Sequence, residues 1–251
     1  FSDGSFEELL KQKETAERIL DGKLKFYIDG TSAFFLSEMG LFQKIHEFLP
    51  NLLVPQSVIN FLTDISDQFR ATPGHVGFMG YSEGNITFTL KNEVMTKKIQ
   101  SDIIASIKLL ESDVNKISLI SSVNKLQCFT EKEIPGELCD ACILAQKENL
   151  PVLTEDFLYL KFNEFETNKI APPYFSSFVL VKLLYEKGKI SFGEYLDYFY
   201  YLSTYRFRFL TVNTDDIEKA VFSDNKIKIV RPENLRKLNF SLTLSEEYGV
   251  T

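Results

Sequence analysis

Residues 24–32, "LKFYIDGTS", place an aspartate directly after a short apolar run that predicts a buried strand at 24–28. An ionised carboxylate is costly to remove from water unless it is paired or bound to a cation. Two interpretations of Asp29 are open. Its side chain either caps a helix that starts here, or it is a ligand at the carboxyl end of a strand, where open α/β sheets bind their ligands.

Strands and helices alternate along the chain, which predicts an α/β fold with a mostly parallel central sheet flanked by helices. A glycine-containing stretch at about 74–91 interrupts this alternation and predicts an inserted β-hairpin, and paired helices near the end predict a helical C-terminal extension. The expected strands are 24–28, 51–54, 116–121, 150–153 and 207–212. The expected helices are 5–20, two short ones within 32–48, 55–69, 92–111, 136–148, 175–187, 191–202 and 213–221. Ser191 and Glu194 form a capping box at the start of one of them.

This pattern indicates one main domain with additions at both ends. We expect a linking helix within 1–22, a domain at 23–222 that contains the hairpin, and a tail at 223–251. The chain begins with Phe1 rather than Met, which suggests an excised part of a longer chain whose other domains would be partners.

Composition excludes several classes of protein. A net charge of −7 argues against coating nucleic acid by bulk electrostatics, although an enzyme can still meet a polyanion through a metal ion. The apolar runs fall short of the roughly 18 residues of a membrane span. Three cysteines, an odd number, do not make a disulfide framework, so we expect a reducing, cytoplasmic location. The 23 Phe and 11 Tyr residues recur at helix or strand spacing and predict core packing.

Cys139 and Cys142 form a C-x-x-C pair within "ELCDACILAQ", a helical pattern. Zinc would need about two further ligands, and the remaining Cys and His residues show no paired spacing. Two partly buried helical thiols are therefore the preferred interpretation.

Acidic residues occur at or near the ends of two predicted strands. Asp29 follows the first strand, and Thr154, Glu155 and Asp156 follow the strand at 150–153. Asp140 lies among small and apolar residues of the preceding helix, where its alternatives are a salt bridge or a helix-dipole contact. Carboxylates that converge on one sheet edge repel one another, and a hard cation such as Mg²⁺ or Mn²⁺ relieves that repulsion.

The order "YIDGTSAFFLSEMGLF…LLVPQSVINFL…LCDACILAQKENLPVLTEDF" resembles the PIN-domain nucleases, and most closely PIN-like domains embedded in large bacterial multidomain proteins. The motifs that carry the resemblance are a strand ending in Asp before Ser or Thr, a "VP-x-x-V" helix, an Asp in a small-residue helix and a strand ending "LT-x-D". The resemblance covers roughly residues 23–222.

The resemblance implies a metal-dependent endoribonuclease that hydrolyses RNA phosphodiesters. Asp29, Asp140 and Asp156 would be the catalytic residues and would hold Mg²⁺ or Mn²⁺. Thr31, Ser32 and Thr154 would orient a carboxylate or a water molecule around them.

The chain departs from the family pattern at Phe61, which stands where the family has its second acid. Asp64 is three residues further along the same helix, on roughly the same face, and could substitute as a metal ligand. Glu155 and Glu137 are further candidates. The departure leaves open an alternative function, a catalytically degenerate PIN-like domain that binds RNA or protein without cutting it.

Two other enzyme classes fit less well. Phosphatases with a D-x-D-x-T motif need a second Asp where Thr31 stands, and no G-x-G-x-x-G follows a strand as a Rossmann dinucleotide enzyme requires.

Overall fold

A sheet of five strands, in the order β5-β2-β1-β6-β7, forms the centre of the computed structural model, and all of its pairings are parallel. The structure describes residues 6–49, 51–71, 77–82, 85–90, 93–112, 117–120, 136–155, 171–204, 222–224 and 227–230. The strands are β1 (Phe26–Ile28), β2 (Leu52–Pro55), β5 (Ile117–Ile120), β6 (Val152–Leu153) and β7 (Tyr174–Phe175). The predicted α/β fold with a parallel central sheet is thus confirmed.

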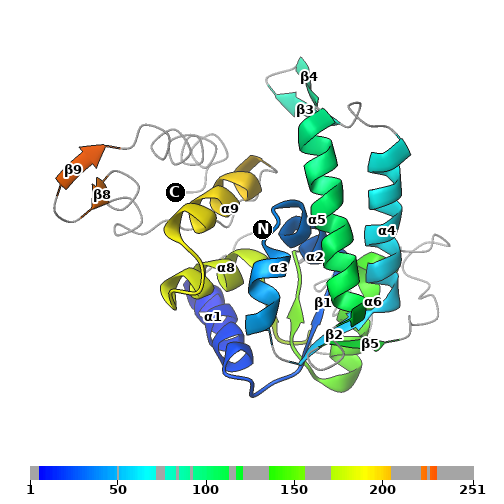
Figure 1. The fold of residues 1–251 in the computed structure, drawn as a ribbon. Helices are drawn as coiled ribbons and strands as arrows, with labels where there is room; N and C mark the ends of the chain where they lie inside the picture. The colour runs from blue at the N-terminus through cyan, green and yellow to red at the C-terminus, as the bar shows by residue number, and fades with distance from the viewer. Residues whose placement is uncertain are drawn as a thin grey trace. The chain divides into compact units, whose positions relative to one another are not determined.

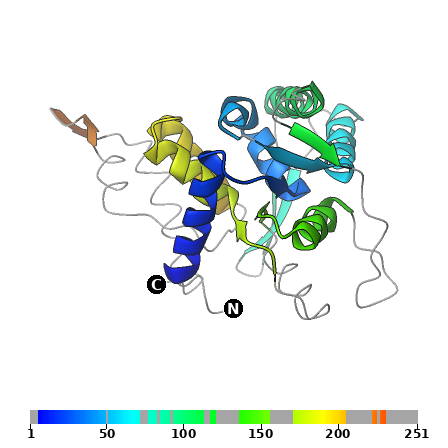
Figure 2. The ribbon, with the colours of Figure 1, turned by 90° about the horizontal axis from the view of Figure 1, so that it is seen from below.

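Helices cover both faces of this sheet, as crossover connections between parallel strands require. Figure 2 shows α5 and α6 on opposite sides of the strands. The helices around the sheet are α2 (Gly30–Glu38), α3 (Phe42–Ile45), the 3₁₀ helix η1 (His46–Phe48), α4 (Gln56–Ala71), α5 (Glu93–Ser112) and α6 (Gly136–Glu148). The two short helices predicted within 32–48 are α2 and α3, and Gly40, with a positive φ of 65°, separates them.

The inserted hairpin is present between α4 and α5 (Figure 1). Strands β3 (Gly77–Ser82) and β4 (Asn85–Leu90) pair antiparallel and belong to a sheet of their own. The hairpin therefore leaves the order of the central sheet intact.

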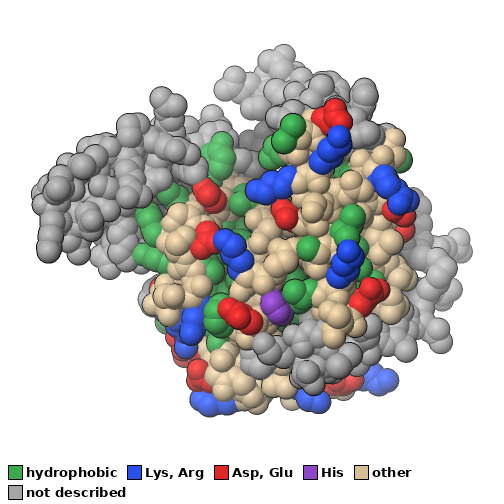
Figure 3. All heavy atoms as spheres, in the orientation of Figure 1, with side chains coloured by type: hydrophobic (Ala, Val, Ile, Leu, Met, Phe, Trp, Pro, Cys, Tyr) green, Lys and Arg blue, Asp and Glu red, His purple; other side chains and the backbone are tan. Residues whose placement is uncertain are grey.

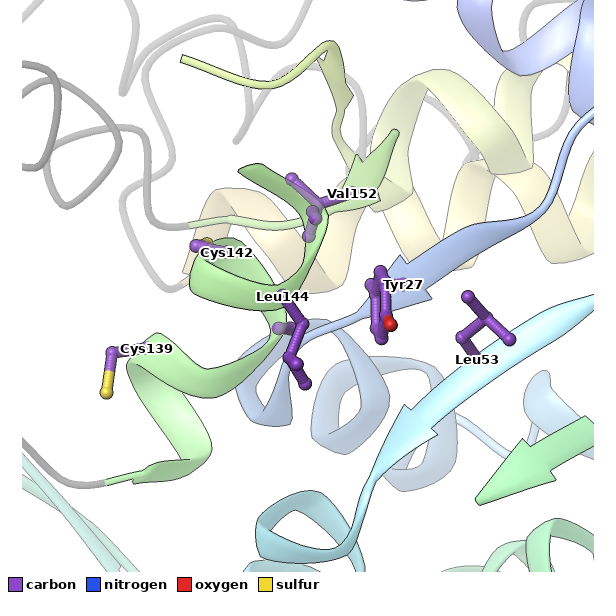
Figure 4. Packing of buried hydrophobic residues seen from close by; sticks show 8 residues of the cluster. Tyr27, Leu53, Cys139, Cys142, Leu144 and Val152 are labelled. Carbon is purple, nitrogen blue, oxygen red and sulfur yellow. The ribbon is translucent and has the colours of Figure 1, made fainter. Parts of the chain in front are cut away.

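Apolar side chains on the two sides of β1 explain why this strand is central. Tyr27 is fully buried and lies between Leu53 of β2 and Leu144 of α6 (Figure 4). Cys139 and Cys142 of α6 belong to the same cluster as buried thiols, and neither forms a disulfide bond with a described residue. Their helical, buried placement is the one that the sequence favoured over zinc binding.

Contacts divide the chain into two compact units. The sheet and its helices belong to Glu14–Ser177, and the second unit consists of Phe1–Lys13 and Phe178–Thr251. The helix α1 (Phe6–Leu20) begins in the second unit and ends in the first. The predicted domain boundaries at 22 and 222 remain a prediction.

The described part of the second unit is built on α8 (Ser177–Glu186) and α9 (Phe192–Thr204), which form the predicted helical extension. Aromatic rings pack between these helices, with Tyr185 stacked on Tyr195 at 5.0 Å and Phe178 at 6.2 Å from Tyr195. A short hairpin of β8 (Phe222–Asp224) and β9 (Ile227–Val230) follows. The strand expected at 207–212 and the helix expected at 213–221 lie outside the described residues.

The predicted start of the helix that follows residue 174 is wrong. The helix expected at 175–187 begins at Ser177, and Phe175 instead pairs with Leu153 as part of β7. The two-residue strand was not predicted, because pairing with β6 defines it rather than any pattern of its own. None of the helices in the described ranges combines the length and apolar character needed to cross a bilayer.

Candidate active site

The parallel register brings the ends of β1 and β6 together. Ile28 is paired with Leu153, and the next backbone amide, that of Asp29, donates to the Leu153 carbonyl at 3.1 Å. The chain runs outward from β1 to β2 and β5 on one side, and from β6 to β7 on the other. The gap between β1 and β6 is therefore the topological switch point, where open α/β sheets bind their ligands.

The Asp29 carboxylate accepts hydrogen bonds at this point from Ser32 and Thr154. Its Oδ1 accepts from the Ser32 backbone N–H at 2.7 Å, which makes it the N-cap of α2, and its Oδ2 accepts from the Thr154 hydroxyl. Only 1% of the residue is exposed. The helix-cap interpretation of Asp29 is thus correct, but the cap is also a buried carboxylate at the switch point.

Glu155 is a second acid at the same point. Its Oε1 accepts from the backbone N–H of Ser177, the first residue of α8, at 2.7 Å. Burial raises the pKa of the Glu155 carboxyl to about 7, hydrogen bonds from Ser177 act in the opposite direction, and the charge of Asp29 raises the pKa further. Glu155 therefore ionises less readily than a carboxyl in water, because burial and, to a smaller extent, the charge of Asp29 disfavour its charged form.

Asp140 lies in the second turn of α6, a helix that contacts β1 and α2. The residue is 3% exposed, and its Oδ2 is buried without a hydrogen-bond partner. Neither alternative from the sequence applies within the described residues, since Asp140 makes no ion pair there and lies beyond the first turn. A buried carboxylate oxygen without a donor is costly, and such an atom calls for an explanation such as an ion.

Two hydroxyl residues follow Asp29 in the first turn of α2. Ser32 is fully buried, and its Oγ has no hydrogen-bond partner, whereas Thr31 is half-buried. Together with Thr154, these side chains place hydroxyl groups just beyond the ends of both β1 and β6.

A sequence model of a family described as the PIN domain associated with the TPR-GreAB-C-PIN system matches residues 27–164, more than half of the chain. The chain belongs to this PIN-domain family. No curated protein and no solved structure gives a significant match. PIN domains are generally nucleases that use divalent metal ions, and the matched residues of this PIN domain include Asp29, Asp140 and Asp156.

The position predicted from the sequence for the family's second acid carries an aromatic side chain, that of Phe61. Phe61 of α4 is half-buried, and its ring meets that of Phe34 in α2 edge-on at 6.5 Å. Asp64, one turn further along, is exposed and makes no hydrogen bond or ion pair with any described residue. The structure therefore does not join Asp64 to Asp29, and its role as a ligand remains a prediction.

The donors present suit a hard divalent ion, since Asp29, Glu155 and the free Oδ2 of Asp140 offer the oxygen ligands that Mg²⁺ and Mn²⁺ prefer. Within the described ranges, no group of three or more His, Cys, Asp or Glu side chains is arranged to hold a metal ion. Asp156 and the side chain of Glu137 lie outside the described residues.

Sequence reasoning missed Ser177. Its contribution is a backbone N–H at the start of a helix, 22 residues after Glu155, and no sequence motif marks it. Only the pairing of β6 with β7 brings it to the site.

Proposed function

We propose that this PIN domain is a Mg²⁺- or Mn²⁺-dependent endoribonuclease that hydrolyses RNA phosphodiesters. Asp29, Asp140 and Asp156 would hold the metal ion. The observation that carries the proposal is the buried carboxylate of Asp29, fixed at the switch point beside a second acid whose pKa is raised to about 7. Neighbouring carboxylates repel each other, and a divalent cation that binds between them relieves this repulsion and can also bind the phosphate of a substrate.

Each residue has a distinct task in such a site. The Ser32 N–H and the Thr154 hydroxyl keep the Asp29 carboxylate in one orientation. The free Oδ2 of Asp140 is available as a ligand. Thr31 and the free hydroxyl of Ser32 can orient a water molecule or the phosphate. A divalent ion held by these acids would supply the activation of water for in-line attack and the stabilisation of the leaving oxygen.

The mixed charges on the surface favour RNA binding through a metal ion at the acidic site over binding through a large positively charged surface. Figure 3 shows basic and acidic side chains mixed over the face that carries α4 and α5. Lys97 is paired with Glu93 at 2.7 Å, and Arg70 with Asp67 at 3.0 Å. With a net charge of −7, the chain would depend on its metal ion for most of its attraction to phosphate.

The family description also suggests partners. It places the PIN domain in a TPR-GreAB-C-PIN system. We infer that this chain works beside TPR and GreAB-C domains.

Cleavage of single-stranded RNA in the presence of Mn²⁺ tests the proposal. Asp140→Asn keeps the size of the side chain but removes its charge, so cleavage should fall by more than the ~100-fold that loss of an outer-shell partner costs. Asp67→Asn, which changes an exposed acid of α4 in the same way, is the matched control and should cleave like the wild type. Equal cleavage by the wild type and Asp140→Asn would contradict the assignment, and loss of cleavage in a further variant, Asp64→Asn, would identify that residue as a ligand.

A second function is favoured by Phe61, whose packing against Phe34 leaves no acid at the expected position. In that case the domain binds RNA or protein without cutting it. Calorimetric titration with Mn²⁺ separates the two functions, because a degenerate domain would show no binding at millimolar metal.

A further inference from the structure

The acidic site extends beyond the residues that the family model matches. The match ends at residue 164, yet β7 and the first residue of α8 contact the end of β6. The Val152 N–H donates to the Pro173 carbonyl at 2.9 Å, and the Thr154 N–H donates to the Phe175 carbonyl at 3.1 Å. These bonds fix the strand end from which the Thr154 hydroxyl reaches Asp29.

Ser177 completes this arrangement. As the first residue of α8, it has an N–H that no carbonyl within the helix can accept, and this N–H donates to Glu155 at 2.7 Å. The helix dipole adds to the attraction, since a carboxylate is stabilised at a helix N-terminus. Ser177 is fully buried, and its hydroxyl is a second donor to Glu155. The carboxylate is therefore oriented by a fixed backbone group rather than by a mobile side chain.

We propose that Glu155 supplies the acidic ligand that Phe61 does not, and that Ser177 is the positioning residue that holds it beside Asp29. This inference rests on the proposed function of the same site. Phe61 cannot bind a cation through an oxygen atom, and Asp64 is exposed and makes no hydrogen bond or ion pair with another residue of the described ranges. Glu155, by contrast, lies one residue beyond the strand end that is hydrogen-bonded to Asp29.

A purely structural role is the competing interpretation, in which Glu155 only caps α8. A cap stabilises the helix but has no effect on affinity for a metal ion. Mn²⁺ affinity of the metal-free protein therefore distinguishes the two roles.

The experiment compares Mn²⁺ binding by calorimetry in the wild type, Glu155→Gln and Ser177→Pro. Proline is accepted at the first position of a helix, where it deletes the N–H donor without breaking a helical hydrogen bond. Ser177→Ala removes only the hydroxyl, and is the second variant should the proline ring not fit the buried position. Glu194→Gln and Ser191→Ala are matched controls, because this Ser–Glu pair caps α9 with the same chemistry in an exposed setting.

We expect Glu155→Gln and Ser177→Pro to weaken Mn²⁺ binding on the order of 10- to 100-fold, with a smaller loss in Ser177→Ala and none in the two controls. Unchanged Mn²⁺ binding in Glu155→Gln, accompanied only by lower thermal stability, would overturn the inference. The RNA cleavage assay tests the proposed function separately from the Mn²⁺ titration, which tests the role of Glu155. A wild type that binds Mn²⁺ through Glu155 without cutting RNA disproves the nuclease but supports this inference, and a wild type that neither binds nor cuts overturns both.

Discussion

Two helices of this protein begin with the same pair of residue types in opposite settings. At α9, Glu194 reaches back to Ser191 and accepts from its N–H at 2.9 Å and its hydroxyl at 2.8 Å, all in an exposed position. At α8, the acid that accepts from the Ser177 N–H is Glu155, which comes from the end of another element 22 residues earlier. The first pair is local and solvated, whereas the second is long-range and half-buried.

The difference shows that burial and a neighbouring charge give a carboxylate at a helix start properties that an exposed helix cap lacks. The Ser191–Glu194 pair provides hydrogen-bond partners for N–H groups at the start of α9, and this capping is its only role in the comparison. Glu155 also shares its surroundings with Asp29, so burial and a neighbouring charge raise its pKa to about 7. A carboxylate that is costly to ionise without a cation suits a binding site better than a cap.

The largest expected effect concerns the pH dependence of stability. The pKa of Glu155 lies at about 7 in the folded protein, above its usual value of 4.5. Between these values the folded state holds the proton more tightly, so the free energy of unfolding of the metal-free protein falls as the pH rises. At about 1.4 kcal/mol per unit of pKa, the loss amounts to about 3 kcal/mol by pH 8. Glu155→Gln keeps an acceptor for Ser177 and should lose this dependence, as chemical denaturation at pH 5 to 8 would reveal.

Glu194→Gln provides the control, because its pH profile should follow that of the wild type. Parallel profiles for the wild type and Glu155→Gln would mean that Glu155 ionises as it does in water. In that case Glu155 at the start of α8 would behave like the exposed Glu194 at the start of α9.

A matched pair of glycines tests the same contrast between exposed and packed positions at a smaller scale. Gly40 and Gly188 have positive φ angles of 65° and 67°. A Cβ at Gly40 would lie 3.2 Å from Oδ2 of Asp102, whereas a Cβ at Gly188 would meet nothing within 4 Å. Gly188→Ala should cost about 1 kcal/mol for the left-handed backbone alone.

Gly40→Ala should cost more, by up to about 1 kcal/mol beyond that strain, because the Asp102 carboxylate must move. Thermal unfolding of the two variants measures the difference. Equal losses of stability would show that Asp102 yields freely and that packing adds nothing at this turn.

The smallest effect is expected at the exposed cap. Glu194→Gln should lower the free energy of unfolding by no more than about 1 kcal/mol, since the Ser191 side chain still caps α9 through the Glu194 N–H at 3.2 Å. Denaturant titration at neutral pH measures this loss. A larger loss of stability, or any change in Mn²⁺ affinity, would show that the Ser191–Glu194 pair is more than an exposed helix cap and would contradict the contrast with Glu155 and Ser177.

Much of the fold was predictable from periodicity and local signals. Apolar spacing predicted α4, α5 and α6, the glycine-rich stretch predicted the hairpin of β3 and β4, and the capping box predicted the start of α9. The strand β7 was not predictable, because two residues carry no period and pairing alone defines them. The site was predictable in part: the structure brings the Thr154 hydroxyl to Asp29, whereas the convergence of Asp140 and Asp156 on Asp29 stays a prediction. The contact of Glu155 with Ser177 depends on β7.

The sequence by itself determined the family, the order of the elements and the acidic end of the central strand, because these depend on local residue types and spacing. Only the tertiary structure decided which of the acids act together. Parallel pairing of β1 with β6 sets Asp29 against Thr154, and pairing of β6 with β7 brings the start of α8 to Glu155. Register between distant strands is a property of the packed sheet, so it cannot be read from any one segment.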